Sequence, residues 1–311
     1  MVSPRAEADA GAKAERGRHQ SVLASSRTPR SHARMAWRQF RRNPGALIGL
    51  GVLVLIAVVA AFAWQLMPHD PYTIESSLRR AGISSDAWLG RDEVGRDILS
   101  RIILGSRIAL GVAAFAVAVG LAFGTIIGLS AAYAGGKVDT VLSLLVDLML
   151  AFPSLLLAIV IVAALGPGLR NTALAIGIST IPIYARIVRG AALAVSRNDY
   201  VEAARALGAQ PPRILARHIL PNIVSSITVI STIQLARAIL TEASLSFLGL
   251  GAQPPEPSWG TMAAAGRRFL QTDPHIVLVP SVAIMITVLA FNLFGDGLRD
   301  ALDPRLRTIE R

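Results

Sequence analysis

The stretch NDYVEAARALGAQPPRILARHILPN, residues 198–222, is the longest charged interval between two apolar segments in the C-terminal half of the chain. Asp199 followed by Glu202 has the spacing of an N-terminal capping box, and Gly208 is a typical helix stop. The Gln-Pro-Pro sequence forms a turn, and its prolines are tolerated at the start of a second helix. Pro221 is expected to end that helix. The stretch therefore predicts two short helices joined by a tight turn.

The first of these helices presents a face of small residues. Positions three to five residues apart share one side of a helix, and here that side is nearly free of bulk. Another protein surface can therefore approach the backbone closely, and the flanking charges can fix its register. The face consists of Ala203, Ala204, Leu207 and Gly208, flanked by Glu202 and Arg205.

Residues 198–222 have two other interpretations. An Ala-rich amphipathic helix commonly packs on its own protein. The run EAARALGAQPPRILARHI also has the outline of a DNA-binding helix-turn-helix. The element lacks a third helix to complete such a domain, and it lies between membrane-type segments. A docking element for another protein is therefore favoured, and no nucleic acid is expected.

The composition is typical of a multi-spanning membrane protein. Of 311 residues, 53% are apolar and 16% charged, and the mean hydropathy is +0.53. The net charge of +11 comes from arginines beside the apolar segments, which favours membrane orientation over nucleic-acid binding. The absence of cysteine excludes disulfides and thiol chemistry.

The apolar runs predict an all-α membrane protein with six transmembrane helices. We expect a disordered basic tail over 1–44, a first span over 45–67, an extracytoplasmic loop over 68–107 and a tail over 296–311. Residues 108–295 form a five-helix core. Its spans cover residues 108–132, 140–165, 171–193, 223–250 and 276–293. Arginine-rich segments favour the cytoplasmic side, which places both termini and residues 198–222 there.

Two local patterns predict structure rather than chemistry. Asp92, Glu93 and Asp97 alternate with arginines and have no neighbouring histidine or cysteine, so a salt-bridged loop is favoured over a metal or acid–base site. The glycines at 120, 124 and 128 form a small-xxx-small stripe, which lets membrane helices pack closely.

Three ionisable residues fall inside apparent spans: Asp147, Arg237 and Glu242. Buried charges of this kind usually face a bundle interior or a water-filled path, so all three are candidate pathway residues. Asp147 and Glu242 have an alternative, since they lie near the two interfaces and can pair with neighbouring helices. Arg237 lies deepest and is the best pathway candidate.

The chain contains no recognisable site for catalysis or for an energy source. A P-loop requires GxxxxGK[ST], whereas Gly136-Lys137 is followed by Val138 and has Ala131 where the first glycine belongs. The five histidines are scattered, and no metal or catalytic cluster is formed. Transport would therefore need an ion gradient or an energy-supplying partner, and the docking helix favours a partner.

Residues 198–222 resemble the cytoplasmic EAA loop of the ABC importer permeases, which reads E-A-A, then Gly, then I-x-L-P. The residues that match are Glu202, Ala203, Ala204, Gly208, Leu220 and Pro221. Position 218 is His, as in the RHILPN form of the dipeptide, oligopeptide and nickel branch. Runs at 89–110, 240–260 and 291–307 also resemble that branch, and specifically its second, C-type subunit. Arg237 stands where a small or apolar residue is expected.

The resemblance implies a bacterial inner-membrane permease with a MetI-like transmembrane domain, paired with a homologous permease. Two cytoplasmic ATPases would bind ATP and Mg, so this chain would need no cofactor and would not itself be an enzyme. An extracytoplasmic binding protein would deliver the substrate. The EAA helix would couple to an ATPase through the matched residues together with Arg205 and Leu207. Peptides, glutathione and nickel chelates stay open as substrates, and an ion-coupled carrier or a membrane-tethered regulator are the alternatives.

Overall fold

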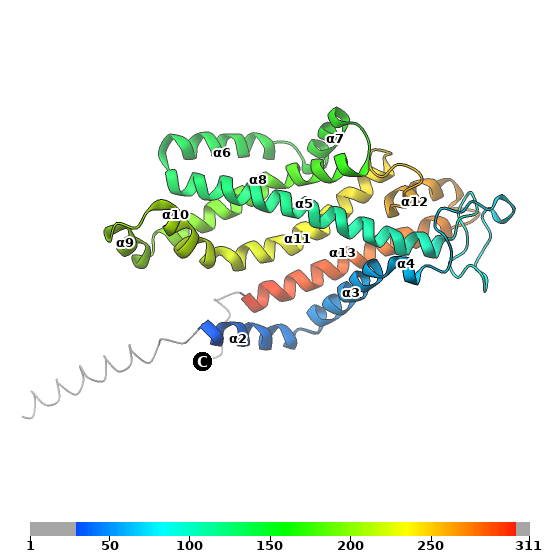
Figure 1. Cartoon of the computed structure of the whole chain (residues 1–311), viewed down its shortest axis with the longest axis horizontal. Coiled ribbons are helices and arrows are strands. Elements are labelled where there is room, and N and C mark those ends of the chain that lie inside the picture. Colours follow the sequence, from blue (N-terminus) through cyan, green and yellow to red (C-terminus); the bar gives the residue numbers. More distant parts are fainter. Residues whose placement is uncertain (1–28, 303–311) are drawn as a thin grey trace, which may run out of the picture.

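The computed structural model describes residues 29–302, and the regular elements in that range are all helices. Five of these helices are long and apolar enough to cross a membrane, or six crossings result if one bent pair is counted. The five run side by side along the long axis of the molecule (Figure 1). They are α3 (Pro44–Ala61), α5 (Ile98–Ala134), α8 (Leu169–Ser196), the continuous helix Pro211–Phe247 that contains α11 (Leu220–Phe247), and α13 (His275–Leu302).

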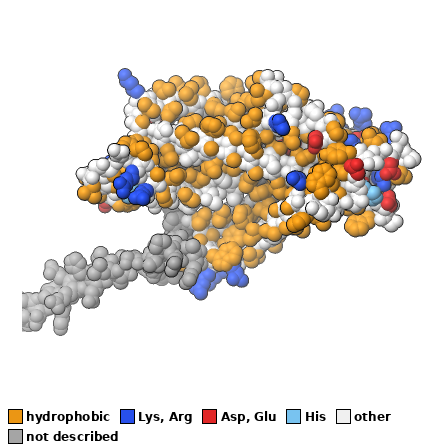
Figure 2. Space-filling view, in the orientation of Figure 1, with side chains coloured by type: hydrophobic (Ala, Val, Ile, Leu, Met, Phe, Trp, Pro, Cys, Tyr) orange, Lys and Arg blue, Asp and Glu red, His pale blue; other side chains and the backbone are white. Residues whose placement is uncertain are grey.

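Shorter helices mark the two ends of this bundle (Figure 1). Helix α9 (Asp199–Ala206) lies at one end of the bundle, which is here called the α9 end. Helix α12 (Trp259–Gly266) lies at the opposite end, which is called the α12 end. Figure 2 shows apolar side chains over the middle of the visible face and charged side chains gathered towards both ends, as a membrane-spanning bundle requires. The remaining short elements are α4 (Ala63–Leu66), α10 (Pro211–Ile214) and the 3₁₀ turns Ser76–Leu78 and Arg267–Phe269.

The third expected span, 140–165, is not one straight helix. It divides into α6 (Gly136–Leu150) and α7 (Ser154–Leu165), which meet at 89°. Pro153 accounts for the break, because it has no amide hydrogen and disfavours helical geometry at the residue before it. The bent pair still carries the chain from the α9 end to the α12 end, where Gly168 N donates to Leu250 O at 3.2 Å.

Helices α5 and α8 form a close seam along the predicted glycine stripe. Gly120, Gly124 and Gly128 are all buried there, which confirms the prediction. A Cβ at Gly128 would lie 2.6 Å from Ala185 O, so only glycine permits this approach of the two backbones.

The N-terminal region differs from the expectation of a disordered tail to residue 44. Residues 1–28 lie outside the described residues, but Pro29–Arg42 forms helix α2. Phe40 is buried and packs edge-on against Phe294 of α13, with ring centroids 5.7 Å apart. This contact joins segments far apart in the sequence, so the local pattern gave no sign of it. Asn43 then caps α3 by accepting from Ala46 N at 3.1 Å.

The C-terminal boundary of the first polar loop also follows from capping. Helix α5 starts at Ile98, ten residues before the expected span, because Asp97 accepts from Ser100 N at 2.8 Å.

The expected C-terminal tail is partly helical, since α13 continues to Leu302; residues 303–311 lie outside the described range.

Candidate functional site

The predicted docking segment, residues 198–222, stands at the α9 end of the bundle (Figure 1). Helix α9 stops at Ala206, and Gly208 adopts a φ of +78°, a left-handed conformation that favours glycine. Ala203 and Gly208 are exposed, Ala204 is half-buried, and Leu207 is 89% exposed. Such an exposed apolar side chain, on an ordered turn beside exposed small residues, is a candidate contact for a partner.

The expected capping box is not formed. Asn198 is the N-cap and Asp199 is already the first residue of α9, so the Asp199 and Glu202 side chains do not have the N-cap and N3 positions that the motif requires. The cap is made by the backbone instead, because Val201 N donates to Asn198 O at 2.9 Å.

The segment is held firmly although its small face is exposed. Val201, Ile214 and Ile219 are buried in one apolar cluster with Ala192 of α8. The Arg205 guanidinium lies over the Tyr133 ring of α5 at 5.7 Å from the centroid. The segment is thus fastened to two spanning helices. The sequence pattern does not single out Val201, Ile214 and Ile219, because their spacing is irregular.

Pro221 does not end the second helix, contrary to the expectation. Residues Leu215–Ile219 form a π-helical turn, and α11 begins at Leu220 with Pro221 in its first turn. Pro221 has no amide hydrogen, so one backbone hydrogen bond of a regular helix is missing here, and the wider π-helical turn accommodates this loss. The side chain of Asn222 also contributes, since its Nδ2 donates to His218 O at 2.7 Å. The docking segment therefore continues directly into a spanning helix.

Asp147 of α6 forms an ion pair with Arg186 of α8. Both side chains are 59% exposed. A second pair joins the same two helices, with Arg189 Nε 2.5 Å from Asp139 Oδ1 and Arg189 Nη2 2.6 Å from Asp139 Oδ2. These contacts agree with the alternative that Asp147 pairs with a neighbouring helix.

Glu242 is buried inside the bundle, 1% exposed, and its Oε1 accepts two hydrogen bonds. Ser246 Oγ donates at 2.7 Å from the next turn of α11, and Ser258 Oγ donates at 2.9 Å from the N-cap of α12. Glu242 thus fastens the α11–α12 connection, which is a structural role.

Arg237 is the exception among the three intramembrane charges, and its side chain is exposed. It forms no ion pair with any described residue. It lies on one face of α11 between two hollows, of about 480 Å³ towards the α9 end and about 440 Å³ towards the α12 end. The α11 residues on this face, three or four positions apart, are Ser226, Ile230, Ile233, Arg237, Leu240 and Ser244.

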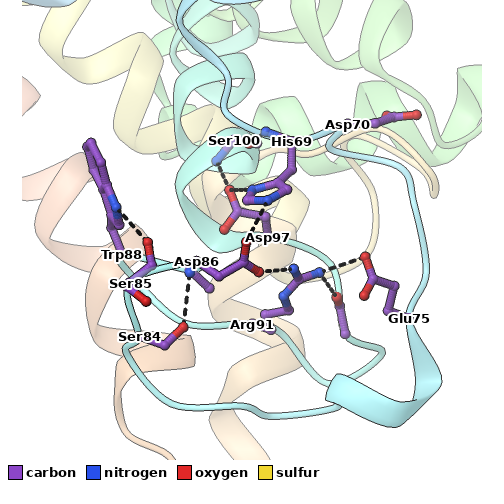
Figure 3. A network of polar contacts seen from close by, with 12 residues as sticks. His69, Asp70, Glu75, Ser84, Ser85, Asp86, Trp88, Arg91, Asp97 and Ser100 are labelled. Atoms are coloured by element: carbon purple, nitrogen blue, oxygen red, sulfur yellow. Dashed lines mark hydrogen bonds and ion pairs between the residues drawn. The ribbon is translucent and has the colours of Figure 1, made fainter.

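The loop at the α12 end is organised around buried Arg91 (Figure 3). Its guanidinium donates to Asp86 at 2.9 Å, to Glu75 at 3.1 Å and to Gly95 O at 3.2 Å. The hydrogen bond from Arg91 lowers the pKa of Asp86. His69 Nε2 lies 3.4 Å from the same carboxylate (Figure 3).

The neighbouring acids are paired in the same loop. Arg96 contacts Asp92 at 2.7 Å and Glu93 at 3.2 Å, and Asp97 caps α5. The prediction of a salt-bridged loop is therefore confirmed, and the network serves to order residues that have little apolar core of their own.

Comparison with known families gives this arrangement its context. Residues 120–308 match the family described as the inner-membrane component of binding-protein-dependent transport systems. Residues 31–82 match the N-terminal transmembrane domain of oligopeptide transport permease C. The chain belongs to this family of inner-membrane permeases. This membership decides against the membrane-tethered regulator and the ion-coupled carrier.

Close relatives of the permease cover nearly its whole length. The glutathione transport system permease protein GsiD of Pectobacterium atrosepticum is 48% identical over 286 residues, covering 91% of this chain and 94% of the relative. The dipeptide transport system permease protein DppC of Alkalihalophilus pseudofirmus is 45% identical over 275 residues, covering 88% of this chain and 90% of the relative. The resemblance to the C-type subunit is thus confirmed.

The permease also shares its fold with a solved structure. An inward-facing structure of the MetNI methionine ABC transporter aligns with a TM-score of 0.55 at 20% identity, covering 66% of this chain and 98% of that one. At that identity the likeness concerns the fold alone, and it confirms the expected MetI-like architecture.

Proposed function

We propose that this permease subunit works in an ATP-driven importer of peptides or related small solutes such as glutathione. The names of its relatives support this substrate class. A homologous permease would complete the translocation path, an extracytoplasmic binding protein would deliver substrate, and two cytoplasmic ATPases holding ATP and Mg would supply the energy. The chain itself would hold no cofactor.

Residues 198–222 would couple the permease to an ATPase. The observation that carries this proposal is the exposed Leu207 beside Ala203, Ala204 and Gly208, on a segment fastened to α5 and α8 and continuous with α11. An ATPase that moves this segment would therefore move a spanning helix as a rigid lever. Glu202, Arg205, Leu220 and Pro221 complete the expected coupling residues.

The orientation follows from the same proposal. With the bent pair counted as one crossing, six crossings place α2, the coupling segment and the end of α13 on the cytoplasmic side. The loop over residues 68–97 and α12 would then face the binding protein. The concentration of arginine in the N-terminal tail, the coupling segment and the C-terminal tail supports this direction.

The composition of the purified complex tests the proposal. The tagged permease, purified in mild detergent and analysed by mass spectrometry, is expected to bring with it a second permease and two ATPase copies. A chain that purifies alone and transports in vesicles lacking ATP would overturn the importer assignment.

Of the three charged candidates for the pathway, we retain Arg237, because Asp147 and Glu242 have partners within the bundle. A guanidinium on an exposed face of a spanning helix is too costly to leave in lipid, so it would face the path between the two permeases. There it would bind the carboxylate of a passing peptide.

Arg237→Gln is expected to reduce uptake of a dipeptide about tenfold, since hydrogen bonds to charged groups contribute about 1.5–3 kcal/mol. Uptake of the C-terminally amidated dipeptide should change little, and Arg237→Lys should retain part of the activity. Uptake assays in vesicles with both peptides make the comparison. An equal loss for both would show that Arg237 does not recognise a carboxylate.

A further inference from the structure

Exposed arginines and an exposed tryptophan surround the junction between α2 and α3. Arg38, Arg41 and Arg42 are all exposed, and Trp37 is 55% exposed. Trp37 stacks on Phe40, with ring centroids 5.9 Å apart and ring planes 8° from parallel. Since Phe40 is buried against α13, this stacking fixes the position of the tryptophan.

Two neighbouring helices place this junction at the edge of the bilayer. Helix α3 exposes apolar side chains from Leu47 onwards, only six residues after Arg41. On α13 the charges begin at Asp296, within one turn of the Phe294 side chain that contacts Phe40. At a rise of about 1.5 Å per residue, both markers put the arginines within about 10 Å of the hydrocarbon boundary. That is the level of the phospholipid head groups.

The described residues, 29–302, do not neutralise these charges fully. Arg38 and Arg41 form no ion pair with a described residue. The acidic residues on the adjoining turns of α13 are Asp296 and Asp300, both exposed, and neither is joined to these two arginines by an ion pair. Within the described part of the chain, no carboxylate occupies these two guanidinium groups, so both can bind an external anion.

We propose that the face formed by Trp37, Arg38 and Arg41 binds the head groups of anionic phospholipids. Guanidinium groups bind phosphate oxygens in a bidentate manner, and tryptophan is favoured at the head-group level. Each basic residue beside an anionic leaflet strengthens binding to the lipid about fivefold. Two arginines should therefore raise the affinity for an anionic lipid, relative to a neutral one, roughly 25-fold. The bound lipid would hold the start of α3, and with it the contact of α2 with α13, at a fixed depth.

Lipid binding to the full-length chain, purified with the subunits that accompany it, tests this proposal without reference to transport. Native mass spectrometry would measure binding of phosphatidylglycerol and phosphatidylcholine to the wild type and to the double variant Arg38→Gln with Arg41→Gln. We expect the wild type to bind phosphatidylglycerol more tightly than phosphatidylcholine. In the double variant, the ratio of the two affinities should fall at least tenfold.

The matched control is Arg107→Gln with Arg268→Gln, which removes the same charge from exposed residues near the α12 end. The control should keep the preference, and Arg38→Lys with Arg41→Lys should keep part of it. Equal binding of the two lipids by the wild type would overturn the proposal. So would an equal loss in the control, or loss of a bound protein subunit with unchanged lipid binding.

Discussion

Replacing Leu207 by aspartate is expected to abolish coupled transport while leaving the permease folded. The side chain is 89% exposed, so its loss removes no internal packing. If Leu207 enters a groove of the ATPase, burying a carboxylate there would cost about 2 kcal/mol or more, as for an interface hot spot. The affinity for the ATPase would then fall about 30-fold or more. Co-purification of the ATPase and substrate-dependent ATP hydrolysis measure the effect.

Ile83→Asp provides the matched control for this prediction. Ile83 is 71% exposed in the loop between α3 and α5, so it is also an apolar side chain outside the core, but at the α12 end. Its replacement should leave the ATPase bound. A Leu207→Asp complex that keeps its ATPases and transports normally would contradict the coupling role.

Bulky replacements at Ala204 or Gly208 should also uncouple ATP hydrolysis from transport. Unlike Leu207→Asp, these replacements also disturb packing or backbone conformation within the permease itself. Ala204 is half-buried, and any side chain at Gly208 must adopt a φ of +78°. Normal transport by Gly208→Trp would nevertheless refute close docking at this face.

Gly124→Val is expected to have the largest effect on stability. Its Cβ would lie 2.7 Å from Ile181 O and 3.0 Å from Ala185 N, so the backbones of α5 and α8 would have to separate. Overpacking of this kind costs about 1–3 kcal/mol or more, which lowers the melting temperature by about 5–10 °C. Thermal melting and size-exclusion profiles in detergent would detect the loss.

Gly111→Val, in the same helix, is the control for that substitution. A Cβ at Gly111 would meet no other atom within 4 Å, so valine there causes no overpacking. Both variants change the intrinsic helix propensity equally, and they differ only in packing. Equal stability of the two variants would mean that the glycine stripe does not determine the seam.

Several features of the site could be predicted from sequence because they depend on neighbouring residues. Gly208 marks the end of α9 through its own backbone preference, whereas the exposure of Leu207 comes from the turn after Ala206 and not from helical spacing. The partners of the intramembrane charges could not be predicted in this way. Glu242 meets Ser258 and Asp147 meets Arg186 only after the helices are assembled.

The sequence by itself determined the class of the protein, its apolar spans and the glycine seam, because hydropathy and residue spacing are local properties of the chain. The tertiary structure decided how the helices begin, bend and continue. Pro153 breaks a span whereas Pro221 lies within a continuous helix, and α2 forms where Phe40 meets Phe294. Such outcomes depend on contacts between residues distant in the chain. The free energy of those contacts outweighs the local preferences from which a sequence pattern is read.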